Sequence, residues 1–353
     1  MKIALITDTH FGARGDHPAF NEFFFKFWEN IFFPYIIDNN ITTVVHLGDM
    51  VDRRKYINFT TLHSLRKRFI NRLEELDIDF HVIVGNHDVP YRNTNEVNAM
   101  EELFSTRNMT IYSYPETATF DKTQIAIIPW INHTNMNDTI EFIKKTPAKI
   151  CFGHFEISGF EMDRGNVCHD GLSREFFDKF ETVYSGHFHH RSSDGHITYL
   201  GNTYEMTWAD YNDTRGFHVF DTDTLELEFI ENPYKMFYKI VYDDKLETLE
   251  SIEQKDYDMY KNSYVKVIVA NKTNPILYDL FLDNMYKAST IDMSIVEDFT
   301  DYSEISDEDI VDQSDDTITI LEKYIDALEL SIEADKLKTI MREIYKEAQN
   351  LES

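Results

Sequence analysis

Residues 80–88, with the sequence FHVIVGNHD, join an apolar run to a cluster of polar side chains. The apolar part, 80–84, has the length and composition of a buried strand. Gly85 follows it, and then come three side chains able to bind a metal: Asn86, His87 and Asp88. Asparagine offers an amide oxygen, and histidine an imidazole that titrates near neutral pH. This pattern indicates a functional site, although by itself it also fits a polar turn after a strand.

The composition indicates a folded protein rather than a disordered one. The chain has 353 residues, 42% of them hydrophobic and 14% aromatic, enough for two domains or for one large domain with appendages. Cys151 and Cys168 are too few for a disulfide framework, so we expect reduced thiols in an intracellular protein. The first apolar run is too short for a signal peptide and no run is long enough to cross a membrane. We therefore expect a soluble, cytoplasmic protein with no membrane contact.

The net charge of −29 is an argument against direct binding of nucleic acid. Phosphate backbones are bound mainly through lysine and arginine, which are in the minority here. Two arrangements would overcome this repulsion. Bound metal cations reverse the field locally, and a basic partner can supply positive charge.

The first third of the chain alternates between predicted strands and helices. Strands are expected at 2–7, 43–47 and 80–84, and helices at 20–37, where Pro34 would kink or end the helix, at 58–76 and at 95–107. This alternation predicts an α/β sheet with parallel pairing, in which ligands gather at the carboxyl ends of the strands. Further strands are expected at 124–129, 149–152, 182–185 and 197–200, followed by a hairpin of 217–221 and 224–230.

The chain changes character after about residue 233. A strand at 264–270 and a helix at 275–287 predict a small mixed domain. The acidic run 297–316 has the composition of a solvated linker. From residue 317 the apolar spacing predicts two amphipathic helices broken near Ser331, which would pack back or bind a partner.

Five clusters of polar side chains stand at the ends of these predicted strands. They are Asp8 with His10, Asp49 with Asp52, Asn86 with His87, His154, and His187 with His189. Asp8 and His10, two apart in extended chain, are expected to point the same way. Gly48, Gly85, Gly153 and Gly186 are expected to let the backbone turn sharply.

Carboxylate, imidazole and amide ligands without a thiolate fit Mn²⁺, Fe²⁺ or Zn²⁺ and argue against a structural zinc site. The ligands are too many for one ion, so we expect two ions that share a carboxylate. Such a pair lowers the pKa of a bridging water and holds a phosphate for attack. Six of the remaining histidines are expected to pack in the core or lie on the surface: His46, His63, His81, His133, His190 and His196. For His169 and His218, a place in the lining of the cleft stays open.

Five motifs in this order resemble the calcineurin-like metallophosphoesterase family. They are TDTHFG at 7–12, HLGDMVDRRK at 46–55, IVGNHD at 83–88, GHFEISGF at 153–160 and SGHFH at 185–189. The resemblance covers residues 1 to about 220, and it is closest to nuclease subunits of the SbcC–SbcD type and their phage recombination-endonuclease relatives.

The resemblance implies a four-layer α/β/β/α sandwich with a small α+β capping domain and C-terminal helices. The nuclease domain would span 1–220, the capping domain 221–296, the acidic linker 297–316 and a helical partner-binding segment 317–353. A phage-encoded protein of this kind would act in the cytoplasm of the host cell.

The resemblance also implies a role for each matching residue. Asp8, His10 and His189 would hold one metal ion, Asn86, His154 and His187 the other, and Asp49 would bridge them. Mn²⁺ is the expected ion, with Mg²⁺, Fe²⁺ or Zn²⁺ as alternatives. His87 would stabilise or protonate the leaving oxygen. Asp52 receives no catalytic role, because some relatives have a phosphate-contacting histidine there.

By the same resemblance, the chain would be the DNA exo/endonuclease subunit of a recombination and repair complex. Residues 317–353 would bind an SbcC-type coiled-coil ATPase, and helices near 58–76 and 95–107 would form a homodimer. Arg53, Arg54 and Lys55 either contact the DNA backbone or form a solvated loop. Two other functions stay open: a phosphatase or cyclic-nucleotide phosphodiesterase of the same fold, and a DNA-end scaffold that regulates the ATPase.

Overall fold

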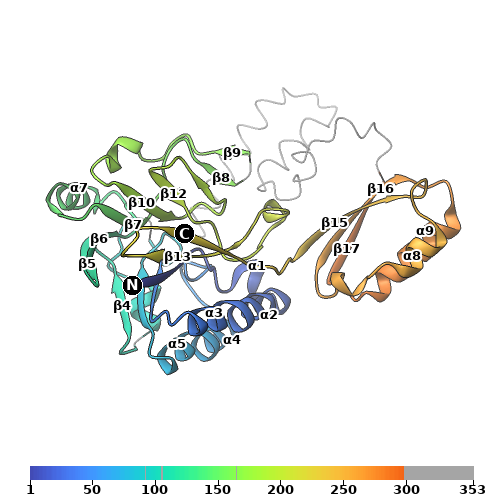
Figure 1. The fold of residues 1–353 in the computed structure, drawn as a ribbon, viewed down its shortest axis with the longest axis horizontal. Coiled ribbons are helices and arrows are strands. Elements are labelled where there is room, and N and C mark those ends of the chain that lie inside the picture. Colours follow the sequence, from blue (N-terminus) through green and yellow to red (C-terminus); the bar gives the residue numbers. More distant parts are fainter. Residues whose placement is uncertain (92, 105, 164, 298–353) are drawn as a thin grey trace, which may run out of the picture. The chain divides into compact units, whose positions relative to one another are not determined.

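Two six-stranded β-sheets form the centre of the first 231 residues (Figure 1). They are seen in a computed structural model, which describes residues 1–91, 93–104, 106–163 and 165–297. The first sheet has the strand order β14-β13-β1-β2-β3-β4 and the second β11-β12-β10-β7-β6-β5. The strands of the first sheet are β1 (Lys2–Ile6), β2 (Thr43–His46), β3 (Asp79–Ile83), β4 (Met109–Tyr112), β13 (Gly216–Asp221) and β14 (Leu227–Glu231). Those of the second are β5 (Glu116–Phe120), β6 (Thr123–Ile128), β7 (Ile150–His154), β10 (Thr182–Gly186), β11 (Ser192–Ser193) and β12 (Ile197–Tyr199).

Parallel pairing brings the functional ends of the strands together. β1, β2, β3 and β4 are parallel neighbours, and so are β6, β7, β10 and β12. The predicted hairpin is confirmed, because β13 and β14 pair antiparallel with Phe217 opposite Ile230. Two short strands, β8 (Glu161–Asp163) and β9 (Asn166–Val167), form a separate ribbon after β7.

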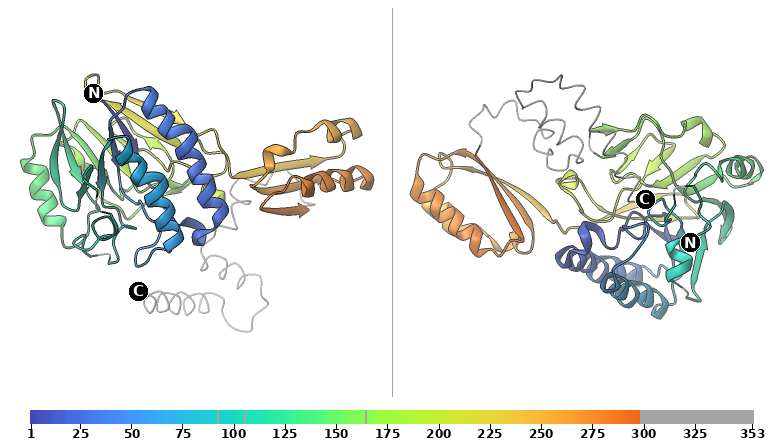
Figure 2. Two further views of the ribbon diagram at one scale, coloured as in Figure 1. Left: turned by 90° about the horizontal axis from the view of Figure 1, so that it is seen from below. Right: turned by 180° about the vertical axis from the view of Figure 1, so that it is seen from behind.

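Helices cover the outer faces of both sheets (Figure 2). The blue helices on one side belong to residues 13–75, and the green helix on the other is α7. Their bounds are α1 (Ala13–Asp16), α2 (Pro18–Phe27), α3 (Phe33–Asp38), α4 (Phe59–Leu65), α5 (Asn71–Glu75), α6 (Ala99–Leu103) and α7 (Met136–Lys145). Short 3₁₀ turns lie at Arg174–Phe177, Trp208–Asp210 and Asp258–Tyr260.

The two long predicted helices are each interrupted by a π-helical turn, at Trp28–Phe32 and at Arg66–Ile70. The first turn explains why Pro34 does not end the helix. Phe33 N–H donates to Trp28 O, five residues back, so the helix has already widened where the proline ring enters at the start of α3. The helix predicted at 95–107 is shorter than expected, since α6 starts after the N-cap Asn98 and Phe104 is extended.

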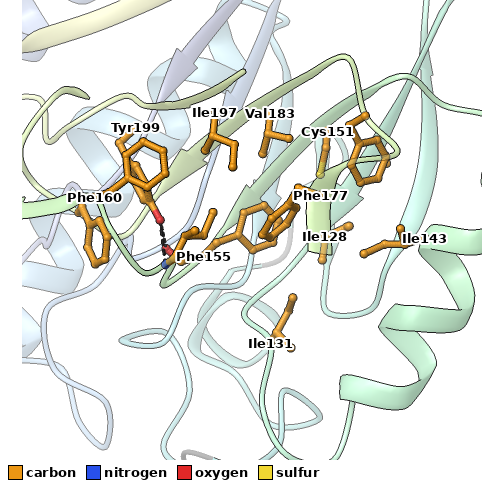
Figure 3. Close-up of a cluster of buried hydrophobic side chains, with 14 of the residues drawn as sticks. Ile128, Ile131, Ile143, Cys151, Phe155, Phe160, Phe177, Val183, Ile197 and Tyr199 are labelled. Carbon is orange, nitrogen blue, oxygen red and sulfur yellow. Dashed lines mark hydrogen bonds between the residues drawn. The ribbon is translucent and has the colours of Figure 1, made fainter. Parts of the chain in front are cut away.

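Three apolar layers hold the sandwich together. Leu5 and Val45 meet Ile127 and Phe152 between the two sheets. Beneath α7, a second layer covers the outer face of the second sheet (Figure 3), where Phe177 lies among residues of β6, β7 and β10. Cys151 and Cys168 both lie in this layer as free, buried thiols.

Aromatic rings form the third layer, between the first sheet and its helices. Trp28 packs edge-on against Phe69 with ring centroids 4.7 Å apart, and Phe24 stacks on Tyr204 at 3.9 Å. The three layers confirm the predicted four-layer α/β/β/α arrangement.

Residues 237–297 form a smaller α+β part with its own core. A parallel three-stranded sheet of β15 (Phe237–Asp243), β16 (Tyr264–Asn271) and β17 (Asp292–Glu297) packs on α8 (Leu249–Gln254) and α9 (Pro275–Lys287). The strand and the helix expected here are both present, and Asn274 caps α9 ahead of Pro275. The predicted acidic linker after Glu297 and the predicted terminal helices lie outside the described residues. Among the residues that are described, no helix is long and apolar enough to cross a membrane.

Candidate metal centre

The predicted site residues of both sheets meet at the carboxyl ends of β1, β2, β3, β7 and β10. Three groups of donor atoms each lie within 4.8 Å of one another. They are Asp8 with His10 and His189, His10 with Asp49 and His87, and Asp49 with His154 and His187. Asp49 and His10 each belong to two groups, so the donors form one continuous centre.

Asn86 joins this centre through its amide oxygen. Asn86 Oδ1 lies 2.9 Å from His154 Nε2 and 2.8 Å from His187 Nδ1. His10 Nε2 and His189 Nε2 approach to 3.2 Å. All seven predicted ligands and His87 are thus brought to one place. Among the described residues, these groups include neither His169, which is exposed, nor His218, which is buried beside Phe229.

The backbone at the centre is not extended, which corrects the geometry expected for Asp8 and His10. Asp8, His10 and Asp49 have φ values of 50°, 40° and 58°, in the left-handed region that non-glycine residues rarely adopt. Their strained turns are held by hydrogen bonds between strand ends, Asp8 N to Gly48 O at 3.0 Å and His10 N to Asp49 O at 3.1 Å. The two side chains therefore converge because adjacent loops bond each other.

Two of the four site glycines, Gly48 and Gly85, stand at turns as expected. Gly48 has a φ of 102°, and Gly85 O accepts from Asp88 N at 3.3 Å across a turn. A Cβ on Gly85 would lie 2.3 Å from Asp49 N, and one on Gly186 would lie 2.0 Å from Thr7 Oγ1. The prediction of a sharp turn is wrong for Gly153 and Gly186, which lie in strands. Close contact between strand ends excludes a side chain at both Gly85 and Gly186.

Asp88 holds the loop that carries Asp49. Its buried carboxylate accepts backbone N–H bonds from Asp49 at 2.9 Å, Met50 at 2.9 Å, Val51 at 3.2 Å and Gly85 at 2.9 Å. Burial, together with the charge of Asp49, raises the pKa of Asp88 to about 6. Asp88 is part of the quoted motif but was not predicted to have a role of its own.

Asp52 and Arg215 also act on the centre from outside the donor groups. His87 Nδ1 lies 2.6 Å from the Asp52 backbone carbonyl. A carbonyl oxygen only accepts hydrogen bonds, so Nδ1 carries the proton. Nε2 of the neutral ring is then unprotonated and faces the centre. Arg215 is buried, donates to the His189 carbonyl and pairs with Asp210 at 2.7 Å. No motif marks Arg215, so sequence alone gives no signal for it.

A model of the family described as calcineurin-like phosphoesterase matches residues 1–191. The chain belongs to the calcineurin-like phosphoesterase family. It is 32% identical over 356 residues to exonuclease subunit 1 of Enterobacteria phage T4, covering 99% of both chains. It is also 34% identical over 106 residues to the DNA double-strand break repair protein Mre11 of Methanosarcina acetivorans, covering 29% of this chain and 16% of that one.

Two solved structures show weaker likeness to this phosphoesterase. An archaeal phosphodiesterase is 15% identical with a TM-score of 0.32, over 66% of this chain and 100% of its own. A dimetal phosphatase from Danio rerio is 12% identical with a TM-score of 0.34, over 62% of this chain and 91% of its own. At these scores neither carries an argument about the site.

Calcineurin-like phosphoesterases use divalent metal ions, and the charges at this centre fit such ions. Asp8 and Asp49 are both buried, at 0% and 2% exposure. Burial, reinforced by the Asp49 charge, raises the pKa of Asp8 to about 6. Negative charge concentrated in a buried site calls for a compensating cation.

The histidines show the same need for positive charge. Burial acts to lower the pKa of His10, but the carboxylates of Asp52, Asp49 and Asp8 outweigh it and raise the pKa to about 9. Burial likewise opposes protonation of His154, and Asp49 raises its pKa to about 9. Protons on these two rings therefore supply the charge that divalent cations would replace. His10 Nδ1 lies 3.5 Å from Asp52 Oδ1, whereas His10 Nε2 lies 3.9 Å from Asp8 Oδ1 and faces the donor centre.

Proposed function

We propose that this phosphoesterase is a two-metal-dependent DNA phosphodiesterase, the exo/endonuclease subunit of a recombination and repair complex. The observation that carries the proposal is the continuous donor centre, in which Asp49 joins groups from both sheets. The full-length similarity to exonuclease subunit 1 of phage T4 supports action on nucleic acid. The partial similarity to an Mre11 protein supports a place in double-strand break repair.

The proposed ligand sets follow the geometry of the donors. Asp8, His10 and His189 would hold one divalent ion, Asn86, His154 and His187 would hold the other, and Asp49 would be shared. Mn²⁺ is our proposed ion, because mixed oxygen and imidazole donors suit it. When bound, the pair would supply charge neutralisation for the phosphate and an activated water.

His87 is proposed to act on the leaving oxygen. Its Nδ1–H is held by the Asp52 carbonyl, so Nε2 is the atom that would meet substrate. Burial lowers the pKa of His87 in the absence of a phosphate. A phosphodiester anion beside the ring would favour the protonated form, which could then donate to the oxygen that departs.

The decisive assay compares three substrate classes under identical conditions. Linear duplex DNA, a cyclic nucleotide and a phosphoprotein would be incubated with the protein and Mn²⁺, and metal content would be measured in parallel. We expect cleavage of DNA to dominate. Preferential hydrolysis of either alternative would make the chain a phosphatase or cyclic-nucleotide phosphodiesterase, and metal binding without any hydrolysis would favour a scaffold.

The proposed assembly includes an SbcC-type ATPase and a second copy of the chain. The net charge of −29 means that much of the affinity for DNA would come from the partner. We propose the domain division 1–220, 221–296, 297–316 and 317–353, with the last segment binding the ATPase and the regions 58–76 and 95–107 forming a homodimer. The site of action would be the cytoplasm, that of the host for a phage-encoded chain. Loss of ATPase co-purification on deletion of 317–353 would support the assignment, and retained binding would refute it.

Arg53, Arg54 and Lys55 form a basic loop after Asp52, which is proposed to contact the DNA backbone. Arg53 is paired with Asp16 at 2.8 Å and lies over the ring of Tyr56, with its guanidinium 5.0 Å from the ring centroid. Arg53 therefore shapes the loop, and we propose contact with a DNA backbone for the loop as a whole, on the ground of its positive charge. The charge of Arg54 already reaches the centre, since it helps to lower the pKa of His87 after burial and His10.

A further inference from the structure

A cleft with about 200 Å³ of space lies directly beside the donor centre. Its walls are apolar at Trp130, Ile131 and Leu172, and it reaches His154. Glu156 and Asp170 add two carboxylates to its lining. Because it touches a proposed metal ligand, whatever fills this cleft lies next to the reacting phosphate.

Trp130 stands between the cleft and the donor centre. Its ring centroid lies 5.2 Å from that of His187 at an interplanar angle of 42°, and 6.1 Å from that of His154. The indole is only partly buried, so part of the ring stays exposed to the cleft. An exposed aromatic face beside a phosphate site is the kind of surface on which nucleobases stack.

The backbone of Trp130 is fixed by a group of asparagines. Trp130 N donates to Val84 O at 2.9 Å, just before the glycine of the quoted motif. Asn95 Nδ2 and Asn135 Nδ2 each donate to Trp130 O at 2.9 Å. Asn132 in turn donates to Asn95 Oδ1 at 3.0 Å, and both side chains are buried. Buried amides that are fully engaged make a stiff support, so the backbone that carries the indole is held in place before any ligand arrives.

The chemistry of the lining selects among the parts of a nucleotide. Glu156 and Asp170 would repel a phosphate, which excludes the cleft as a path for the backbone. The same carboxylates accept hydrogen bonds from the amino groups of adenine, cytosine or guanine. A flat apolar wall with acceptors at its rim, and room for a single ring system, fits one nucleobase.

We propose that this cleft binds the nucleobase adjoining the scissile phosphate, with Trp130 as its stacking face. The inference rests on the proposed action on nucleic acid. It adds that this base lies on Trp130 in a cleft with about 200 Å³ of space. Trp130 is then a specificity residue, because it contributes to binding of the base and not to binding of the phosphate.

The test uses small esters that separate the base from the chemistry. The p-nitrophenyl ester of deoxyadenosine 5′-phosphate carries a base, and methyl p-nitrophenyl phosphate does not. We expect the full-length Mn²⁺-loaded protein to prefer the nucleoside ester by at least about tenfold in kcat/KM, the effect that one stacked base would produce. Trp130→Ala should remove most of this preference by lowering kcat/KM for the nucleoside ester far more than for the methyl ester, while Trp130→Phe should keep most of it. Tyr286→Ala, which removes an exposed aromatic on α9, is the control and should change neither ester.

A second readout measures binding without turnover. Deoxyadenosine 5′-phosphate should bind the wild-type protein and Trp130→Phe at least about tenfold more tightly than Trp130→Ala, whereas inorganic phosphate should bind all three alike. Equal losses on both esters would overturn the proposal, because Trp130 would then only support the metal ligands. A wild-type protein with no preference for the nucleoside ester would overturn it as well. If the ester preference is present but duplex DNA is not cleaved, the base site stands and the proposed nuclease function fails.

Discussion

His87 is the residue whose proposed role can be separated from metal binding. It lies in a donor group with His10 and Asp49, yet its Nδ1 is occupied by the Asp52 carbonyl at 2.6 Å. We expect His87→Ala to lower kcat for DNA by about 10²- to 10⁴-fold, the usual contribution of a proton donor. Calorimetric titration with Mn²⁺ should show unchanged stoichiometry. His133→Ala, an exposed change in the turn before α7, is the matched control, and undiminished cleavage by His87→Ala would remove the proposed role.

The residues that sequence could and could not assign differ in how they act. Donor atoms such as those of Asp8, Asn86 and His187 could be predicted, because their chemistry shows in the residue type and in their place after an apolar strand. Asp88 and Arg215 act through backbone groups of other residues, on the Asp49 loop and on the His189 carbonyl. A role of this kind depends on three-dimensional contact, which a motif does not encode.

The ends of β1 and β10 are packed so closely that one methyl group should separate them. A Cβ on Gly186 would lie 2.0 Å from Thr7 Oγ1, 2.9 Å from Leu47 O and 3.0 Å from Asp8 Oδ2. We expect Gly186→Ala to destabilise the fold by about 1–3 kcal/mol, as overpacking does, and to weaken Mn²⁺ binding by displacing Asp8. Urea unfolding and metal titration would measure the two effects.

Gly195→Ala is the control for this substitution. Gly195 has a φ of 91°, and a Cβ at this position would meet nothing within 4 Å. The cost of the added methyl group is therefore backbone strain of about 1 kcal/mol, with no effect on the metal. Equal metal affinity in Gly186→Ala and Gly195→Ala would show that the strand ends can move apart without harm to the centre.

Glu205 holds the start of β15 and should make stability depend on pH. Its buried carboxylate accepts hydrogen bonds from Met236 N at 2.6 Å and Phe237 N at 3.0 Å. Burial raises the pKa of Glu205 from 4.5 to about 7, outweighing those bonds. A raised pKa means that stability from this group is full below pH 4.5 and is lost as the pH rises through about 7.

Glu205→Gln removes this titration and keeps an acceptor for both N–H groups. The wild type should lose stability between pH 5 and pH 8, and the variant should not. The free energy of unfolding of the variant relative to the wild type should therefore rise over this range, by on the order of 3 kcal/mol at most. Denaturation at both pH values, in chelator to exclude metal effects, would measure the gain, with the exposed Glu253→Gln on α8 as the control. A gain that is equal at the two pH values would contradict the assigned pKa.

The elements were predicted well where pattern and packing agree. The parallel strands β1, β2 and β3 and the helix α9 follow directly from apolar spacing, caps and turn residues. The π-helical turns at Trp28–Phe32 and Arg66–Ile70 were not predicted, because a single π turn changes the apolar spacing over too few residues to stand out in a long helical pattern. β4 was missed, since half-exposed residues of an edge strand leave a weak pattern.

At the scale of the whole molecule, divalent cations should stabilise the fold as well as serve the chemistry. The chain carries a charge of −29, and Asp8 and Asp49 bury part of it. A ligand that binds only the folded state stabilises it by about 2.7 kcal/mol at a hundred times its Kd. We expect the melting temperature to rise with Mn²⁺ and to fall again with chelator.

Asp49→Asn is the variant that tests the origin of this stabilisation. It removes the carboxylate shared by two donor groups, so the rise in melting temperature with Mn²⁺ should shrink strongly. Asp283→Asn, on the exposed side of α9, should respond to Mn²⁺ as the wild type does. An undiminished response in Asp49→Asn would place the stabilising cations elsewhere on this acidic chain.

The donors that meet at this edge come from opposite ends of a long stretch of chain. His187 N donates to the Asp8 carboxylate across 179 positions, and His189 meets His10 across the same interval. A ribosome must therefore release nearly two hundred residues before Asp8 and His10 can meet His187 and His189. Until then a growing or broken chain holds isolated acids and imidazoles but no reactive centre, so a cell making this protein would be exposed to its chemistry only once both sheets have closed on each other.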